Sequence, residues 1–214
     1  MRAVEGDDDE RVLSPEDSLR LINDQRAEMN RRLGLNPLLF YVPWGVAWFV
    51  GFGAFFLRHG LSGEPYVDLS RGASLTVLLV SIGVALAFTG YAGWRQGHHV
   101  RGESQDRGAM YGLTWSAAYI TMSFVASRFV RHLPPDEADL LWASLSIWVV
   151  SIMLMAGGAV WRLRAMFAGG AAIAVVNAAG VAAGPGWHAL LMSVVVGGGY
   201  IVAALVLRRR MAKA

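Results

Sequence analysis

The chain contains no cysteine, which excludes disulfide bonds and zinc sites built on thiolates. Sequence signatures of catalysis are also missing: it has no Walker motif, no nucleophile elbow, no paired His-Glu zinc helix and no Gly-rich dinucleotide turn. We therefore predict no cofactor and no resident metal. Nothing in the pattern supports an enzyme.

Acidic residues are scarce and unevenly placed. Nine of the 16 lie in the first 28 positions, and none follows Asp139. A water-soluble bundle needs a polar face on its surface helices, and the last two apolar runs have no acidic residue for such a face. The chain is therefore predicted to be an integral membrane protein. The other seven acids lie between apolar runs or at their ends: Glu64, Asp68, Glu103, Asp106, Asp136, Glu137 and Asp139.

Six apolar runs are long enough to cross a hydrocarbon core about 30 Å thick, which takes roughly 20 helical residues. Helices are expected because lipid offers no partner to unpaired backbone groups, and the alternation typical of an outer-membrane barrel is absent. The predicted fold is all-α: six transmembrane helices form three antiparallel hairpins, preceded by an amphipathic cytoplasmic helix. The predicted spans lie near residues 37–57, 72–94, 109–130, 138–160, 163–183 and 188–207.

A weak internal similarity favours the hairpin arrangement. The first span ends in Arg58-His59 and the third in Arg131-His132, each after a group of aromatic residues. Parallel repeats occur in transporters, which place the substrate site at the repeat interface. The alternative is that Trp and Arg gather at the membrane interfaces of unrelated spans.

The positive residues predict the orientation of the chain. With a cytoplasmic N-terminus, twelve Arg and Lys residues flank the spans on the inner side and four on the outer side. This excess favours both termini in the cytoplasm of a bacterium, with the spans in its plasma membrane. The first residues are acidic and polar, so no cleavable signal peptide is expected. Because the surplus Arg residues lie at helix ends, the basic pI does not indicate nucleic-acid binding.

Three segments lie outside the predicted spans. Residues 1–13 are predicted to be a disordered acidic tail, residues 14–34 an amphipathic cytoplasmic helix, and residues 208–214 a basic cytoplasmic tail. Ser14 can cap the helix, and Pro15 suits its first position. Two interpretations stay open for residues 14–33: the helix lies on the inner leaflet of the lipid bilayer, or it docks a cytoplasmic protein partner.

Polar and aromatic side chains recur at helical spacing on the first, third and fourth spans. Aromatic walls with a few hydroxyls suit a small lipophilic or cationic molecule, so these side chains are candidates for a substrate cavity. The alternative is that the hydroxyls join neighbouring helices and the aromatics fill the bundle. With one amide from the fifth span, the candidates are Trp44, Trp48, Trp115, Tyr119, Ser123, Ser144, Trp148, Ser151 and Asn177.

Charged residues within the spans are few. Arg128 is the deepest, and it either extends to the outer interface or forms an ion pair with Asp139. The lack of an intramembrane carboxylate argues against an independent proton-coupled pump. The His98-His99 loop is predicted to be solvated, because no third histidine is near enough for a metal site. Gly180 and Gly184 allow close helix packing, within the chain or across a homodimer.

Two stretches carry a family resemblance: SPEDSL at residues 14–19 and RGAMYG at residues 107–112. They are similar to a family of uncharacterised small six-span membrane proteins from high-GC Gram-positive bacteria, which are often loosely labelled transporters. The helix before the first span also resembles the elbow helix of ATP-binding-cassette exporter permeases. These resemblances imply a transport-related role and bring no catalytic residues.

Two functions are therefore open. The first is a transport-related component or facilitator for a small lipophilic or cationic molecule, with or without a cytoplasmic partner. The second is a non-transporting membrane anchor, sensor or assembly factor that recruits a soluble partner through its N-terminal helix. A polar cavity that reaches mid-membrane between spans one, three and four favours transport, whereas a solidly packed bundle favours the second function.

Overall fold

The computed structural model describes residues 14–21, 24–25, 37–97 and 103–211. The chain divides into two compact units, Met1–Leu35 and Asn36–Ala214. In the first unit, residues 15–21 are helical, and the Ser14 hydroxyl accepts a hydrogen bond from the backbone N–H of Asp17 at 3.1 Å. The predicted cap is therefore confirmed. The acidic tail, most of the predicted helix beyond residue 21 and the His98-His99 loop lie outside the described residues.

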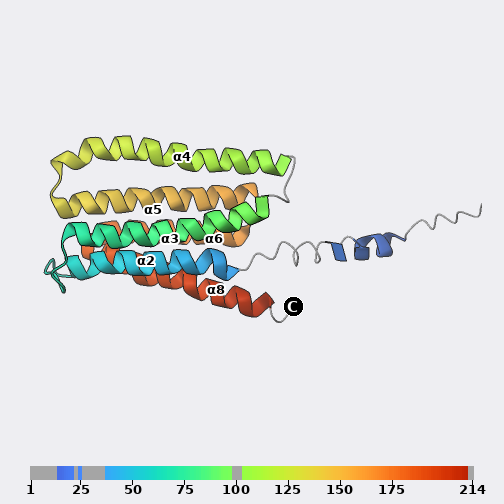
Figure 1. The fold of residues 1–214 in the computed structure, drawn as a ribbon, viewed down its shortest axis with the longest axis horizontal. Helices are drawn as coiled ribbons and strands as arrows, with labels where there is room; N and C mark the ends of the chain where they lie inside the picture. Colours follow the sequence, from blue (N-terminus) through green and yellow to red (C-terminus); the bar gives the residue numbers. More distant parts are fainter. Residues whose placement is uncertain (1–13, 22–23, 26–36, 98–102, 212–214) are drawn as a thin grey trace, which may run out of the picture. The chain divides into compact units, whose positions relative to one another are not determined.

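The described part of the second unit has helices as its only regular structure (Figure 1). Each predicted span overlaps one helical segment, and the last segment is a continuous run of α7, η2 and α8 in which η2 is π-helical. The segments are α2 (Pro37–His59), α3 (Arg71–Gly97), α4 (Glu103–Phe129), η1 (Val130–His132), α5 (Pro135–Val160), α6 (Arg164–Ala183), α7 (Pro185–Leu190), η2 (Leu191–Gly197) and α8 (Gly198–Met211).

Four helical segments in the described residues are long and apolar enough to cross a membrane, which indicates an integral membrane protein. They are Arg71–Trp94, Pro135–Val160, Arg164–Ala183 and Pro185–Arg209. The sequence predicted six spans. Two further helices lie outside this group: α2, which is apolar up to Arg58 and His59 in its last turn, and α4, which contains polar side chains such as Thr114 and Ser116.

The helices pack in a defined order. Helix α2 packs on α3 and also on the α7–η2–α8 segment, which in turn packs on α6. Helix α6 packs on α5, and α5 packs on α4, which lies at the edge of the bundle (Figure 1). The main core cluster draws its side chains from α2, α3, α5, α6 and η2. Its buried members are Ala47, Trp48, Phe52, Ala85, Ile147, Ile173, Met192 and Val196.

Glycine brings several helix backbones into direct contact. A Cβ on Gly170 of α6 would lie 2.7 Å from the Ser151 carbonyl oxygen on α5, and one on Gly158 would lie 2.5 Å from the Phe167 nitrogen. A Cβ on Gly180 would lie 2.9 Å from the Cα of His188. Gly180 therefore allows close packing of helices within the chain, which was the first of its two predicted roles. Gly184 caps the end of α6 with φ 101°.

Two adjacent glycines test the α5–α6 contact. We expect Gly170→Ala to lower the free energy of unfolding by about 1–3 kcal/mol, because the added methyl group would press on backbone atoms of α5. Gly169 is the matched control, because a Cβ there meets nothing within 4 Å. Gly169→Ala should be neutral or stabilising by up to about 1 kcal/mol. Thermal unfolding in detergent measures both, and equal effects of the two substitutions would contradict this packing.

Candidate functional site

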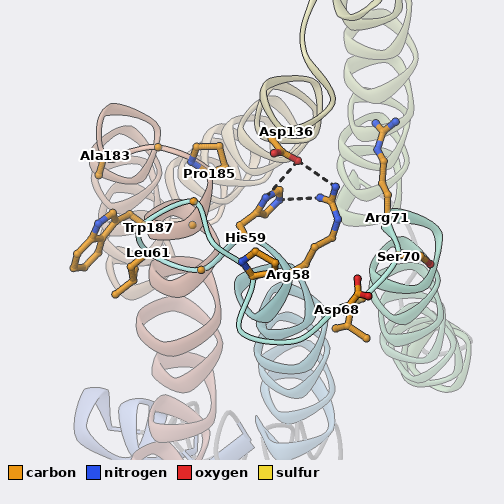
Figure 2. Close-up of a pocket in the computed structure, with 16 residues that line it drawn as sticks. Arg58, His59, Leu61, Asp68, Ser70, Arg71, Asp136, Ala183, Pro185 and Trp187 are labelled. Atoms are coloured by element: carbon orange, nitrogen blue, oxygen red, sulfur yellow. Dashed lines mark hydrogen bonds and ion pairs between the residues drawn. The ribbon is translucent and has the colours of Figure 1, made fainter.

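A cavity of about 470 Å³ lies at the end of the bundle where α2 ends and α3, α5 and α7 begin (Figure 2). Its lining comes from helix ends and loops: residues 58–61, 63, 65, 68–71, 136 and 183–187. Charged and apolar side chains occupy different sides. Arg71, Asp68 and Ser70 lie on one side in Figure 2, and Leu61 and Trp187 lie on the other. This volume lies within the range of small-molecule sites, roughly 300–1,000 Å³.

Glycines in two loops shape this end of the bundle. Gly60 ends α2 with φ 60°, a conformation that other residues rarely adopt. Gly186 lies so close to the Gly60 carbonyl oxygen that a Cβ there would be 1.8 Å from it. The Leu57 carbonyl accepts hydrogen bonds from the backbone N–H groups of Tyr66 and Val67, which folds the loop back onto α2. These contacts hold the loop beside the start of α7.

Four charged side chains form an ion-pair row in which the signs alternate: Asp136, Arg58, Asp139 and Arg71. The Arg58 guanidinium lies 3.2 Å from Asp136 and 3.4 Å from Asp139. Arg71 donates to Asp139 from Nε at 2.8 Å and from Nη2 at 2.6 Å. The two inner side chains, Arg58 and Asp139, are 18% and 12% exposed. The two outer ones, Asp136 and Arg71, are 56% and 50% exposed. The middle of the row is therefore largely buried, and the side chain at each end is accessible to solvent.

His59 lies beside the row, beyond the predicted end of the first span at residue 57. Its side chain is 7% exposed, and Nδ1 is 3.5 Å from Asp136 Oδ1. Its ring stacks on Phe55 with centroids 6.0 Å apart. Burial lowers the pKa of His59 below its ordinary 6.5; Asp136 opposes this shift and Arg58 adds to it. His59 is therefore neutral at pH 7.

His59, Asp136 and Asp139 place three possible metal-ligand atoms within 4.8 Å of one another. The surrounding charges do not suit a cation, because the Arg58 guanidinium lies between the two carboxylates at 3.2 and 3.4 Å. Arg71 also occupies one Asp139 oxygen. A divalent ion would have to displace both arginines and bear their repulsion. The geometry fits an ion-pair network better than a metal site.

The aromatic candidates for a substrate cavity do not come together. Trp48 is 4% exposed in the main core, where its ring contacts those of Phe52 and Tyr200. Trp44 packs against the same core and donates its indole N–H to Thr89 at 2.9 Å. Trp115 and Tyr119 belong to a separate cluster between α4 and α5. The predicted cavity between spans one, three and four is therefore not assembled from these residues.

Two of the hydroxyl candidates donate within their own helix, whereas the alternative interpretation expected the hydroxyls to join neighbouring helices. Ser144 donates to the Leu141 carbonyl and Ser151 to the Trp148 carbonyl, while Ser123 is half-buried on α4. Ser144, Trp148 and Asn177 do line one feature together, a shallow groove of about 440 Å³ between α5 and α6.

Asn177 joins neighbouring segments, as predicted from its isolation in the fifth span. Its Nδ2 donates to the Ser144 carbonyl at 3.0 Å, and its Oδ1 lies 2.8 Å from Nε2 of His188. His188 is 2% exposed and was not predicted as a functional residue.

Asp139 is in an ion pair, but not with the predicted partner. Within the part of the chain that the structure describes, it pairs with Arg58 and Arg71, whereas the Arg128 side chain is exposed and makes no ion pair. The other alternative, extension of Arg128 to the outer interface, stays a prediction. Sequence reasoning missed four site residues: Arg58, His59, Arg71 and Asp136. The sequence feature that could have revealed them is that all of them lie at ends of predicted spans on the same side of the membrane.

No protein family, curated protein or solved structure matches this chain. The resemblances carried by residues 14–19 and 107–112 therefore stay predictions. The case for a function rests on the geometry of the cavity and its charges.

The buried neutral His59 predicts how stability depends on pH. The pKa of His59 in the folded protein lies below 6.5, so at acid pH the unfolded chain binds more protons than the folded chain. The stabilising contribution of neutral His59 to the free energy of unfolding is therefore lost as the pH falls below 6.5. We expect the drop in unfolding temperature between about pH 7 and about pH 5 to be smaller in His59→Gln than in the wild type. Parallel curves for the two proteins would show that His59 does not titrate in this way.

Proposed function

We propose that this protein is a six-span plasma-membrane protein that acts as a non-transporting anchor, sensor or assembly factor. The observation that carries the proposal is the position of the polar cavity. Its lining stops at Arg58 on α2 and Trp187 on α7. Deeper along the same helices lie the buried side chains of Phe55 and Phe52 on α2 and of His188 on α7. This arrangement suits binding at one face better than passage through the bundle.

Six spans are supported by length and by the placement of charge. Helices α2 and α4 have 23 and 27 residues, and a helix of 20 residues already covers about 30 Å. The charged residues of α4 lie near its ends, at Glu103, Asp106, Arg107 and Arg128. With both termini in the cytoplasm, as the positive residues favour, the cavity opens on the outer face.

The N-terminal helix supports the recruitment of a partner. The described segment is capped by Ser14, and Leu19 and Leu21 are 61% and 49% exposed. Large apolar side chains on a short polar helix suit either a protein groove or the bilayer surface. The chain then enters α2 at Pro37, which is the end of that helix opposite to Arg58.

Removal of residues 1–33 tests the recruitment role. We expect this truncation to abolish copurification of a cytoplasmic partner from native membranes, because it removes the docking helix. The unfolding temperature of the bundle should stay unchanged. A finer comparison replaces Leu19 and Leu21 by Ser, with the exposed Glu16 and Arg20 replaced by Ser as the matched control. A partner that is retained on the truncated chain would end the docking proposal.

Transport is the second candidate, and one observation favours it. The π-helical segment η2 contains buried Ser193, and it directly follows α7 with its buried His188–Asn177 contact. Short π-helical segments inside α-helices are frequent at functional sites.

Flux through reconstituted proteoliposomes distinguishes the two candidates. We expect no protein-dependent flux of ethidium, an aromatic cation, because the core beneath the cavity is packed. Saturable flux that falls in Asn177→Ala, but not in the exposed control Ser116→Ala, would replace the sensor proposal by transport.

A further inference from the structure

We propose that the outer cavity binds a small zwitterion, a molecule that carries an ammonium group, an anionic group and a compact apolar part. This inference rests on the proposed function, because it assigns a ligand class to the same cavity. The observations that carry it are the alternating ion-pair row, the exposure of its two ends and the apolar wall opposite.

The ion-pair row has one free anionic end and one free cationic end. Asp136 receives Arg58 and His59 at Oδ1, which leaves Oδ2 without a partner among the described residues. Arg71 donates to Asp139 from Nε and Nη2, so its Nη1 has no partner in the described part of the chain. Both side chains line the cavity, and about half of each is exposed. An ammonium group at Asp136 and an anionic group at Arg71 would complete the alternation of charge.

The charge balance of the lining disfavours a ligand with a single charge. The lining holds two positive side chains, Arg58 and Arg71, and two negative ones, Asp68 and Asp136, beside a neutral His59. A lone anion would meet the two carboxylates, and a lone cation would meet the two guanidinium groups. A zwitterion can place each charge beside its opposite, and such charge-assisted hydrogen bonds are strong.

The inner pair keeps the two ends of the row in place. Arg58 and Asp139 are largely buried and hold their neighbours through contacts of 2.6 to 3.4 Å. The binding groups therefore lose little freedom when a ligand arrives, and this raises affinity. The apolar part of the ligand has a wall to occupy, because Leu61, Pro185 and Trp187 lie on the side away from Arg71 (Figure 2).

Two sources supply this chemistry: a free amino acid with an apolar side chain, and a zwitterionic lipid headgroup. The experiment uses the purified full chain and separates the sources. Leucine is compared with 4-methylpentanoate, which lacks the ammonium group, and with 3-methylbutylamine, which lacks the carboxylate. In the lipid arm, nanodiscs of phosphatidylethanolamine are compared with nanodiscs of phosphatidylglycerol. Binding is read from the shift in unfolding temperature and from tryptophan fluorescence.

We expect leucine or phosphatidylethanolamine to bind at least about tenfold more tightly than its singly charged comparison compounds. Asp136→Asn should weaken this binding by about tenfold or more, because it removes the charge that receives the ammonium group. Glu137→Gln is the matched control: Glu137 is the next residue on α5, it is exposed and it does not line the cavity. Arg71→Gln should weaken binding similarly, with the exposed Arg131→Gln as its control.

Three results would overturn the proposal. They are equal binding of 4-methylpentanoate and leucine, binding that survives Asp136→Asn unchanged, and no binding in either arm up to millimolar concentration. None of these results depends on residues 1–33 or on flux. A protein that recruits its partner but binds no zwitterion would refute only this inference, whereas zwitterion binding with a partner retained on the truncated chain would refute only the recruitment role.

Discussion

The constraint on which the rest depends is that lipid offers no hydrogen bonds to the middle of these helices. Backbone groups must pair within each helix, and charged side chains must collect where the helices end. The ion-pair row obeys this rule, because its four members lie in the last turn of α2, at the start of α3 and within the first five residues of α5. The polar cavity lies at the end of the bundle for the same reason.

Within the bundle, packing replaces the hydrophobic effect, because lipid is as apolar as the side chains. Small residues then contribute more to helix association than large ones, because they let helix backbones approach closely. Gly158 and Gly170 bring the backbones of α5 and α6 together, and Gly45 allows α2 to approach the Gly197 carbonyl oxygen in η2. Several polar groups that lie inside find partners: Asn177 pairs with His188 and Ser144, and Ser193 donates to the Phe49 carbonyl. The Ser74 hydroxyl on α3 is buried without a partner among the described residues.

The sequence was sufficient to locate the helical segments between residues 37 and 211, but not the π-helical form of η2 and not the site. Length and apolarity located each helical segment, and the Ser14 cap followed from local chemistry alone. The site depends on which helix ends meet, and that depends on the lateral order of the helices. Arg58 and Asp139 are 81 positions apart, and nothing in their spacing shows that the end of α2 lies beside the start of α5. Trp48 and Trp115 show that a similar spacing of aromatic residues on two helices does not mean that they meet, because their side chains pack into different clusters.

The most direct test of this account is the side of the membrane on which each end of the bundle lies. The chain has no cysteine, so single cysteines can be introduced at Ser62, in the exposed loop beside the cavity, and at Glu16, in the N-terminal helix. The account predicts that a membrane-impermeant maleimide labels Ser62→Cys in intact cells and labels Glu16→Cys only after permeabilisation. Labelling of both positions in intact cells, or of Glu16→Cys alone, would contradict it.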